Sequence, residues 1–135
     1  MPRNGSMDYF LAVWDLMNRE RKRGPAAVVI CGDDTIKKEG ISGDFLKRYN
    51  NGLLCNQQLC SALSSLNQIG HGWVDRNGEP HTIGTCAEND AADKYLNSFP
   101  NQTISLNTLL FSDAYRPRTR RMQPYCTVCK RTFGL

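Results

Sequence analysis

Hydrophobic and polar positions in the first third of the chain change from helical to strand spacing. Residues 6–23 are predicted to form one helix, because four apolar residues recur at helical spacing: Phe10, Val13, Trp14 and Met17. Gly24-Pro25 ends this helix, and the continuous apolar run at 26–31 predicts a buried strand. Turn residues then lead into a weakly alternating segment at 35–41, so we expect the sheet to begin with a hairpin.

The rest of the chain continues to alternate between helices and strands. Mixed helical spacing predicts a helix over 53–69, preceded by one or two helical turns within 43–52. Asn77-Gly78 is a strong hairpin turn signal between two short strands. Three further elements are expected: a helix over 85–96 with a small-residue face for packing on a sheet, a central strand over 103–115, and a final helix over 126–133.

The composition is typical of one globular domain. At 135 residues the chain is long enough for a single core, with 40% hydrophobic and 22% charged residues. No apolar run approaches the ~20 residues of a membrane span, and no signal peptide is visible. We therefore expect a monomeric, intracellular domain over 7–135, with residues 1–6 resembling a cloning remnant.

The six cysteines introduce candidate chemistry, because three of them fall in two short motifs. Cys86 stands two residues before Glu88, and Cys126 and Cys129 bracket two residues. Three thiolates can occupy three corners of a zinc tetrahedron and leave the fourth to water, whose pKa the metal lowers to near 7. A secreted scaffold with three disulfides is the alternative use, against which the missing signal peptide argues. The other three cysteines are expected in the core: Cys31, Cys55 and Cys60.

Glu88 has two interpretations. Thr85 with Glu88 three residues later fits a capping box, in which the carboxylate only closes the first turn of a helix. Beside an activated water, the same carboxylate would move protons without binding the metal. The downstream Cys126 and Cys129 favour the catalytic interpretation. The positive end of the helix dipole is also expected to favour a thiolate at Cys86.

The two motifs resemble those of the cytidine deaminase-like superfamily, in which a Cys or His, a spacer and a Glu precede a Pro-Cys-x-x-Cys segment. Within it, the chain is most similar to YwqJ-like deaminase domains of bacterial polymorphic toxins, over about residues 25–134. The segments 26–30 and 41–43 also contribute to this resemblance. Family members usually have Pro directly before the first Cys of the pair, whereas Tyr125 intervenes here.

The resemblance implies a three-layer α-β-α cytidine deaminase-like fold with a mixed sheet. It implies that Cys86, Cys126 and Cys129 bind Zn²⁺, and that Glu88 passes the water proton to the ring nitrogen and later protonates the departing ammonia. Cytosine in single- or double-stranded DNA is the favoured substrate, with RNA, adenine and free nucleotides left open. Such a toxin would act in the cytoplasm of a target cell, and a cognate immunity protein would neutralise it in the producing cell.

Five further residues are candidate substrate contacts: Asn89, Trp73, Tyr115, Arg118 and Arg121. Aromatic faces can stack on bases, and the four arginines within 116–121 can pair with phosphates on a chain of net charge +4. The alternatives are core packing for the aromatic residues, a first-turn helix residue at position 89, and a solvated loop for the arginines. His71 and His81 are left out of the zinc shell, because a lone histidine in a loop is more often a hydrogen-bonding group.

A non-enzymatic zinc module is the competing hypothesis. Cys55, Cys60, Cys126 and Cys129 would then form a closed four-thiolate structural site, and the arginine loop would bind nucleic acid passively. Cys86 separates the two hypotheses, because it is a ligand only in the deaminase. A redox pair at the last two cysteines is the third alternative, although no thioredoxin-like context precedes it.

Overall fold

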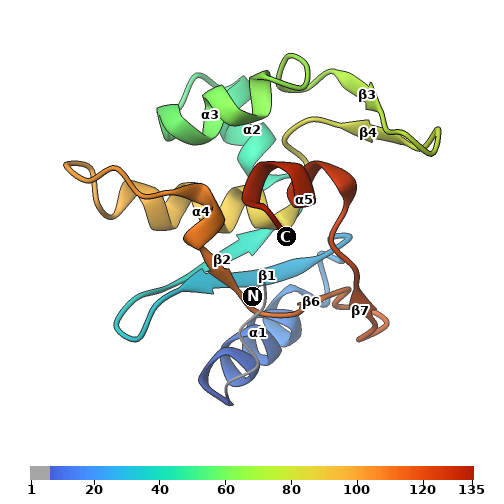
Figure 1. The fold of residues 1–135 in the computed structure, drawn as a ribbon. Coiled ribbons are helices and arrows are strands. Elements are labelled where there is room, and N and C mark those ends of the chain that lie inside the picture. Colours follow the sequence, from blue (N-terminus) through green and yellow to red (C-terminus); the bar gives the residue numbers. More distant parts are fainter. Residues whose placement is uncertain (1–6) are drawn as a thin grey trace.

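The computed structural model describes residues 7–135, so the segment expected to be a cloning remnant lies outside the described residues. Helices and short strands alternate along the chain around a main sheet, which confirms the α/β class (Figure 1). No helix in the described part has the length and apolar character needed to span a membrane. The helices are α1 (Met7–Glu20), α2 (Asp44–Asn50), α3 (Gln57–Ser64), α4 (Ala87–Asn97) and α5 (Thr127–Phe133).

β1 (Val28–Gly32) is the centre of the main sheet. It pairs with β2 (Lys37–Ile41) along its whole length, as the expected N-terminal hairpin. On its other edge β1 pairs with two short strands, β5 (Leu110–Phe111) and β6 (Ala114–Tyr115). β6 in turn pairs with β7 (Met122–Gln123). Every pairing among the described strands is antiparallel, so the expected mixed sheet is wrong.

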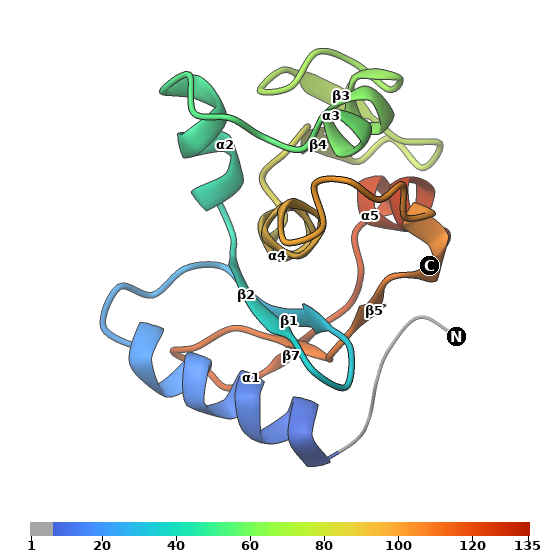
Figure 2. The same cartoon turned by 90° about the vertical axis from the view of Figure 1, so that its left-hand side faces the viewer.

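A separate hairpin lies outside the main sheet. β3 (Gly72–Val74) and β4 (Pro80–Thr82) pair around the turn that Asn77-Gly78 predicts. Figures 1 and 2 both place this hairpin at the opposite end of the molecule from α1. The hairpin prediction is therefore confirmed.

The segment 103–115 does not form the expected central strand. A 3₁₀ turn (Leu106–Thr108) comes first, and β5 and β6 are separated at Ser112. Ser112 N donates to the carbonyl of Ile30 at 2.8 Å, and Ser112 Oγ accepts from Ile30 N at 2.9 Å. The serine side chain thus replaces a backbone partner of β1, which satisfies the strand while breaking the ladder.

The two faces of β1 pack against different helices. Val28 and Ile30 point to the cluster formed with α1, whereas Val29 and Cys31 point to the larger cluster that contains α4. This follows from the two-residue period of a strand, and both faces are apolar because both are covered. Figure 2 shows α1 on one side of the sheet and α4 on the other, with α2, α3 and α5 on the α4 side.

α1 buries a different stripe from the one predicted. Its buried residues are Tyr9, Val13, Leu16 and Met17. Phe10, a member of the predicted apolar stripe, is 42% exposed and stacks on Trp14. Tyr9 and Leu16, which lie outside that stripe, are buried.

The predicted small-residue face of α4 is confirmed, and it lies against a glycine. A Cβ placed at Gly40 of β2 would lie 2.2 Å from the carbonyl oxygen of Ala87 and 2.6 Å from the Cβ of Ala91. Only glycine permits this approach. The N-terminal end of α4 is therefore held directly against the sheet.

α3 is shorter than the helix predicted over 53–69. It begins at Asn56, whose side chain accepts a hydrogen bond from Leu59 N at 3.0 Å and so caps the first turn. Leu54 before it is 91% exposed, and the helix ends at Ser64. Of the three cysteines expected in the core, Cys31 is fully buried, while Cys55 and Cys60 are half-buried against it.

A buried ionic network joins α4 to α2. The guanidinium of Arg48 on α2 binds Asp90 and, at 2.8 Å, Asp93, and both carboxylates are buried. Asp90 also accepts from the backbone N of Ile41, and Asp93 accepts from that of Asn56. Two buried acids on one helix are therefore paired and hydrogen-bonded, and they join α4 to its neighbours.

Candidate metal centre and adjoining cavity

Cys86 and Cys126 occupy equivalent places, each as the N-cap residue of a helix. Cys86 directly precedes α4 and Cys126 directly precedes α5, and both have extended backbone. The capping box expected from Thr85 and Glu88 is wrong, because Cys86 is the cap and Thr85 Oγ1 donates to the carbonyl of Thr82 at 3.0 Å. Thr85 is therefore not the N-cap that the capping-box interpretation of Glu88 requires.

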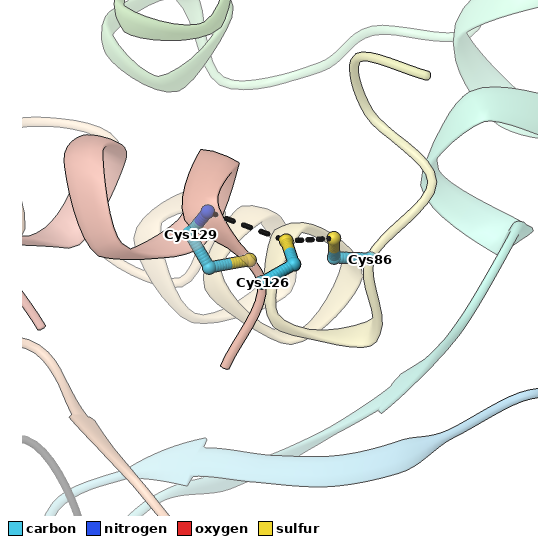
Figure 3. A group of neighbouring side chains, drawn as sticks. All are labelled: Cys86, Cys126 and Cys129. Atoms are coloured by element: carbon cyan, nitrogen blue, oxygen red, sulfur yellow. Dashed lines mark hydrogen bonds between the residues drawn. The ribbon is translucent and has the colours of Figure 1, made fainter. Parts of the chain in front are cut away.

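The three cysteines of the two motifs converge on one point. Their sulfurs lie within 4.8 Å of one another, although Cys86 and Cys126 are 40 positions apart (Figure 3). Zinc–sulfur bonds of about 2.3 Å in a tetrahedron separate the sulfurs by about 3.8 Å. The sulfurs of Cys86 and Cys126 are 2.7 Å apart, so binding a metal requires them to separate by about 1 Å. Three convergent sulfurs form a metal-binding site compatible with zinc.

Hydrogen bonds among the sulfurs distribute the protons in the metal-free cluster. Those from Cys129 and Cys86 lower the pKa of the Cys126 thiol to about 3 despite its burial. The bond to Cys126 raises the pKa of both Cys129 and Cys86 well above the ordinary value. These directions favour the thiolate form at Cys126 when no metal is bound, and the thiolate expected at Cys86 beside a metal stays a prediction. The backbone N of Cys129 also donates to the sulfur of Cys126, at 3.5 Å.

Glu88 lies beside this cluster rather than away from it. Its carboxylate oxygen Oε1 accepts from the Cys129 thiol at 3.8 Å, and the residue is only 5% exposed. Being two positions after the N-cap, it also lies at the positive end of the α4 dipole, where a carboxylate is stabilised. A carboxylate and three sulfurs thus share one buried corner of the fold.

A cavity of about 410 Å³ opens onto this corner. Small side chains and a few polar groups line it: Ala26, Ala27, Ser42, Gly43, Thr85, Cys86, Ala87, Glu88, Ala114, Gln123, Pro124 and Cys126. Its volume is in the range of small-molecule sites. Among the described residues that line the cavity, Glu88 alone carries a carboxylate, so proton transfer between a carboxylate and a bound molecule would fall to this residue.

Asp75 connects the β3–β4 hairpin to the ligand helix α5. Its Oδ2 lies 2.9 Å from His81 Nε2 and accepts from Thr127 Oγ1 at 3.0 Å. The His81 bond, the Glu79 amide and the Thr127 hydroxyl lower the pKa of Asp75 to about 2. Thr127 directly follows Cys126, so this carboxylate fixes the start of the helix that carries two of the sulfurs. His81 accordingly binds a carboxylate, in keeping with its exclusion from the zinc shell.

None of the five candidate substrate contacts is among the described residues that line this cavity. Asn89 is fully buried, and its side-chain atoms have no partner among residues 7–135. Trp73 packs beside His81 and under the guanidinium of Arg131, and Tyr115 packs with the α1 cluster. Two arginines complete the set: Arg118, bound to backbone carbonyls before β1, and Arg121, exposed on the same loop. Their substrate-binding roles stay predictions.

Cys55 and Cys60 are not part of the sulfur cluster. Among the described residues, the groups of three or more potential ligands include only Cys86 with Cys126 and Cys129, and Asp75 with Glu79 and His81. The four-thiolate site required by the competing hypothesis is therefore not formed. No disulfide joins any of the six cysteines, so the three-disulfide alternative is not supported either.

Sequence reasoning missed two polar residues of the cavity wall. Ser42 Oγ accepts from the backbone N of Ala27 at 3.1 Å, and Gln123 comes from β7. The segment 41–43 contributes to the family resemblance, but nothing in it indicates that Ser42 lines a cavity. Gln123 has no sequence signal, because only the folding of β7 beside β6 brings it there.

Comparison of the chain with protein-family models, with curated proteins and with solved structures gives no match.

Proposed function

We propose that the protein is a zinc-dependent nucleobase deaminase that converts cytosine to uracil in nucleic acid, with DNA as the favoured substrate. One observation carries the proposal: three cysteine sulfurs lie together with the Glu88 carboxylate, and Cys86, Cys126 and Glu88 line a cavity of about 410 Å³. The spacing of the cysteines and of Glu88 matches the pattern described for zinc deaminases of bases, except that Tyr125 separates Pro124 from Cys126. Cys86, which distinguishes this function from a structural zinc module, belongs to the cluster.

Cys86, Cys126 and Cys129 would hold the metal through sulfur, the donor that zinc favours in such three-cysteine sets. Bound zinc would supply a water molecule with a pKa near 7, and hence a nucleophile at neutral pH. Asp75, through Thr127, and the α4 packing at Gly40 keep the two ligand-bearing helix ends in place.

Glu88 would carry the protons. In the overall reaction a water oxygen bonds to the amine-bearing ring carbon, the carbon–nitrogen bond breaks, and ammonia leaves. The Glu88 carboxylate would accept one water proton and pass it to the ring nitrogen, and would then move the second proton from the added hydroxyl group to the departing amine. Its burial and its position at a helix N-terminus support this role, because both keep the carboxylate close to the cavity and away from bulk water.

The finer fold assignment and the biological setting belong to the same proposal. Helices on both faces of the sheet support a three-layer cytidine deaminase-like fold, whereas the antiparallel pairing of all described strands departs from it. A toxin role in the cytoplasm of a target cell, with a cognate immunity protein, rests on the motif resemblance alone.

The test combines metal content with base conversion. Protein purified from cells would be assayed for bound zinc and for conversion of cytosine in single- and double-stranded oligonucleotides, beside Glu88→Gln. We expect one zinc per chain in both proteins, with conversion lowered at least 10²-fold by the substitution. Absence of conversion by the zinc-loaded protein on every DNA and RNA substrate, or equal conversion by Glu88→Gln, would refute the proposal.

A further inference from the structure

A second cavity lies next to the proposed base cavity. It has a volume of about 350 Å³, and its lining residues are Gly24, Pro25, Ala26, Arg116, Arg118 and Thr119. Ala26 lines both cavities, so the two share a wall. None of the lining residues of the second cavity is acidic, and two are arginines.

The loop that carries these arginines is held in a defined shape. Arg116 N donates to the carbonyl of Arg121 at 2.9 Å, and Arg120 N donates to that of Arg116 at 2.8 Å. Arg120 has a positive φ of 60°, and its guanidinium packs over the Trp14 ring at 4.8 Å and bonds Asn18. These contacts to α1 stabilise a conformation that a non-glycine residue rarely adopts. The arginine loop is therefore anchored to α1, which differs from the freely solvated loop considered above.

The guanidinium of Arg118 is held by hydrogen bonds to backbone carbonyls and not by an acidic side chain. Its Nη2 donates to the carbonyl of Lys22 at 2.9 Å and its Nε to that of Arg21 at 3.3 Å. Both partners are neutral, so the guanidinium keeps its positive charge at the cavity. The nearby Arg23 differs, because its guanidinium forms ion pairs with Asp44 and with Glu20.

Arg116 lines the second cavity with a guanidinium that has no partner within residues 7–135. Within residues 7–135 no hydrogen bond or ion pair reaches its guanidinium, and the residue is exposed. A guanidinium offers five donors in a planar fork that matches the oxygens of a phosphate. The structure thus places a free donor fork and a second uncompensated positive charge beside the proposed base cavity.

We propose that this second cavity binds a backbone phosphate of a polynucleotide whose base occupies the first cavity. This inference rests on the proposed function for the placement of the base, and it adds the place where the backbone of the strand would be held, at Arg116 and Arg118. Arg116 would bind the phosphate directly, and Arg118 would contribute charge from its fixed position. The shared wall at Ala26 keeps the two sites adjacent, as a base and its flanking phosphate require.

Binding of a fluorescent oligothymidylate, measured by polarisation at a series of salt concentrations, tests the phosphate site. Thymine has no exocyclic amine, so no turnover interferes. Arg116→Gln should weaken binding about 3- to 10-fold at low salt and reduce the slope of log K against log salt by about 0.7. Arg76→Gln is the matched control, because it removes the same charge from an exposed residue in the distant β3–β4 turn, and its affinity should stay within about twofold of wild type.

The outcomes separate this inference from the proposed function. If wild type binds through Arg116 but converts no cytosine, the phosphate site stands and the deaminase proposal fails. If wild type converts cytosine in oligonucleotides while Arg116→Gln matches Arg76→Gln in affinity, salt slope and turnover, the deaminase stands and the phosphate site is overturned. Circular dichroism of both variants checks the fold, because neither side chain forms a hydrogen bond or ion pair within residues 7–135.

Discussion

Replacing Arg48 by alanine should destabilise the protein far more than replacing an exposed arginine. Arg48 bridges Asp90 and Asp93, whose side chains are 0% and 1% exposed. Removing one partner of a buried ion pair leaves an uncompensated buried charge, at a typical cost of 3–5 kcal/mol. Here two carboxylates lose the same partner at once.

The size of the stability loss in Arg48→Ala depends on the hydrogen bonds that Asp90 and Asp93 keep. Asp90 keeps hydrogen bonds from Ile41 N at 2.9 Å and from Lys94 Nζ at 3.1 Å, and Asp93 keeps one from Asn56 N at 2.6 Å. These bonds limit the loss, so we expect the lower end of the range, about 3 kcal/mol. In a domain of this size, that corresponds to a fall in melting temperature of about 10 °C.

Urea unfolding followed by circular dichroism at neutral pH measures this loss. Arg19→Ala is the matched control, because Arg19 also pairs with two carboxylates, of Asp15 and Glu39, but is 48% exposed. Its loss should be below about 1 kcal/mol. Arg48→Lys should lie between the two, since an ammonium group does not reproduce the planar fork that binds both acids.

Equal losses for Arg48→Ala and Arg19→Ala would refute this reasoning, because they would mean that burial adds nothing to the network. Near-equal stability of Arg48→Lys and wild type would show instead that charge alone is sufficient.

Three other changes test the site and its support. Cys86→Ser should lower bound zinc, measured by atomic absorption, while Cys55→Ser should leave it unchanged; the reverse pattern would favour a different ligand set. Gly40→Ala should cost at least about 1–3 kcal/mol in urea unfolding, because the new methyl group meets the backbone of α4, and a neutral effect would contradict the packing. Asp75 has a folded pKa of about 2, below its unfolded value near 4, so its stabilising effect is complete above pH 4 and is lost as the pH falls towards 2. The stability difference between metal-free wild type and Asp75→Asn should therefore shrink over that interval, and a constant difference would contradict the shift.

The sequence predicted those elements whose signals are local. The valine-rich run of β1, the turn at Asn77-Gly78 and the cysteines that precede α4 and α5 each act over a few residues, and the structure has them. The convergence of the three cysteines was also predictable, because two spaced motifs together specify a chemistry that each alone does not.

The errors arise where distant residues decide the outcome. The apolar residues of 103–115 suit a strand, but Ser112 bonds to Ile30 through its side chain, 82 positions away, and divides the strand in two. Asp90 and Asp93 look like solvent-facing helix residues until Arg48 is placed beside them by the fold. Arg116 and Ala26 become neighbours at one cavity only through the sheet.

The short separation between the sulfurs of Cys86 and Cys126, 2.7 Å, has a practical consequence for handling the protein. In air or peroxide, the metal-free form should lose two electrons and two protons to the oxidant and join these sulfurs covalently. Closing a 40-residue loop in this way raises stability by roughly 4 kcal/mol in the chain-entropy treatment. An oxidised sample, in which two of the proposed metal ligands are joined to each other, would thus melt at a higher temperature than a reduced one. Screening by thermal shift would then select the preparation that cannot bind metal through all three sulfurs, unless reductant is present from lysis onward.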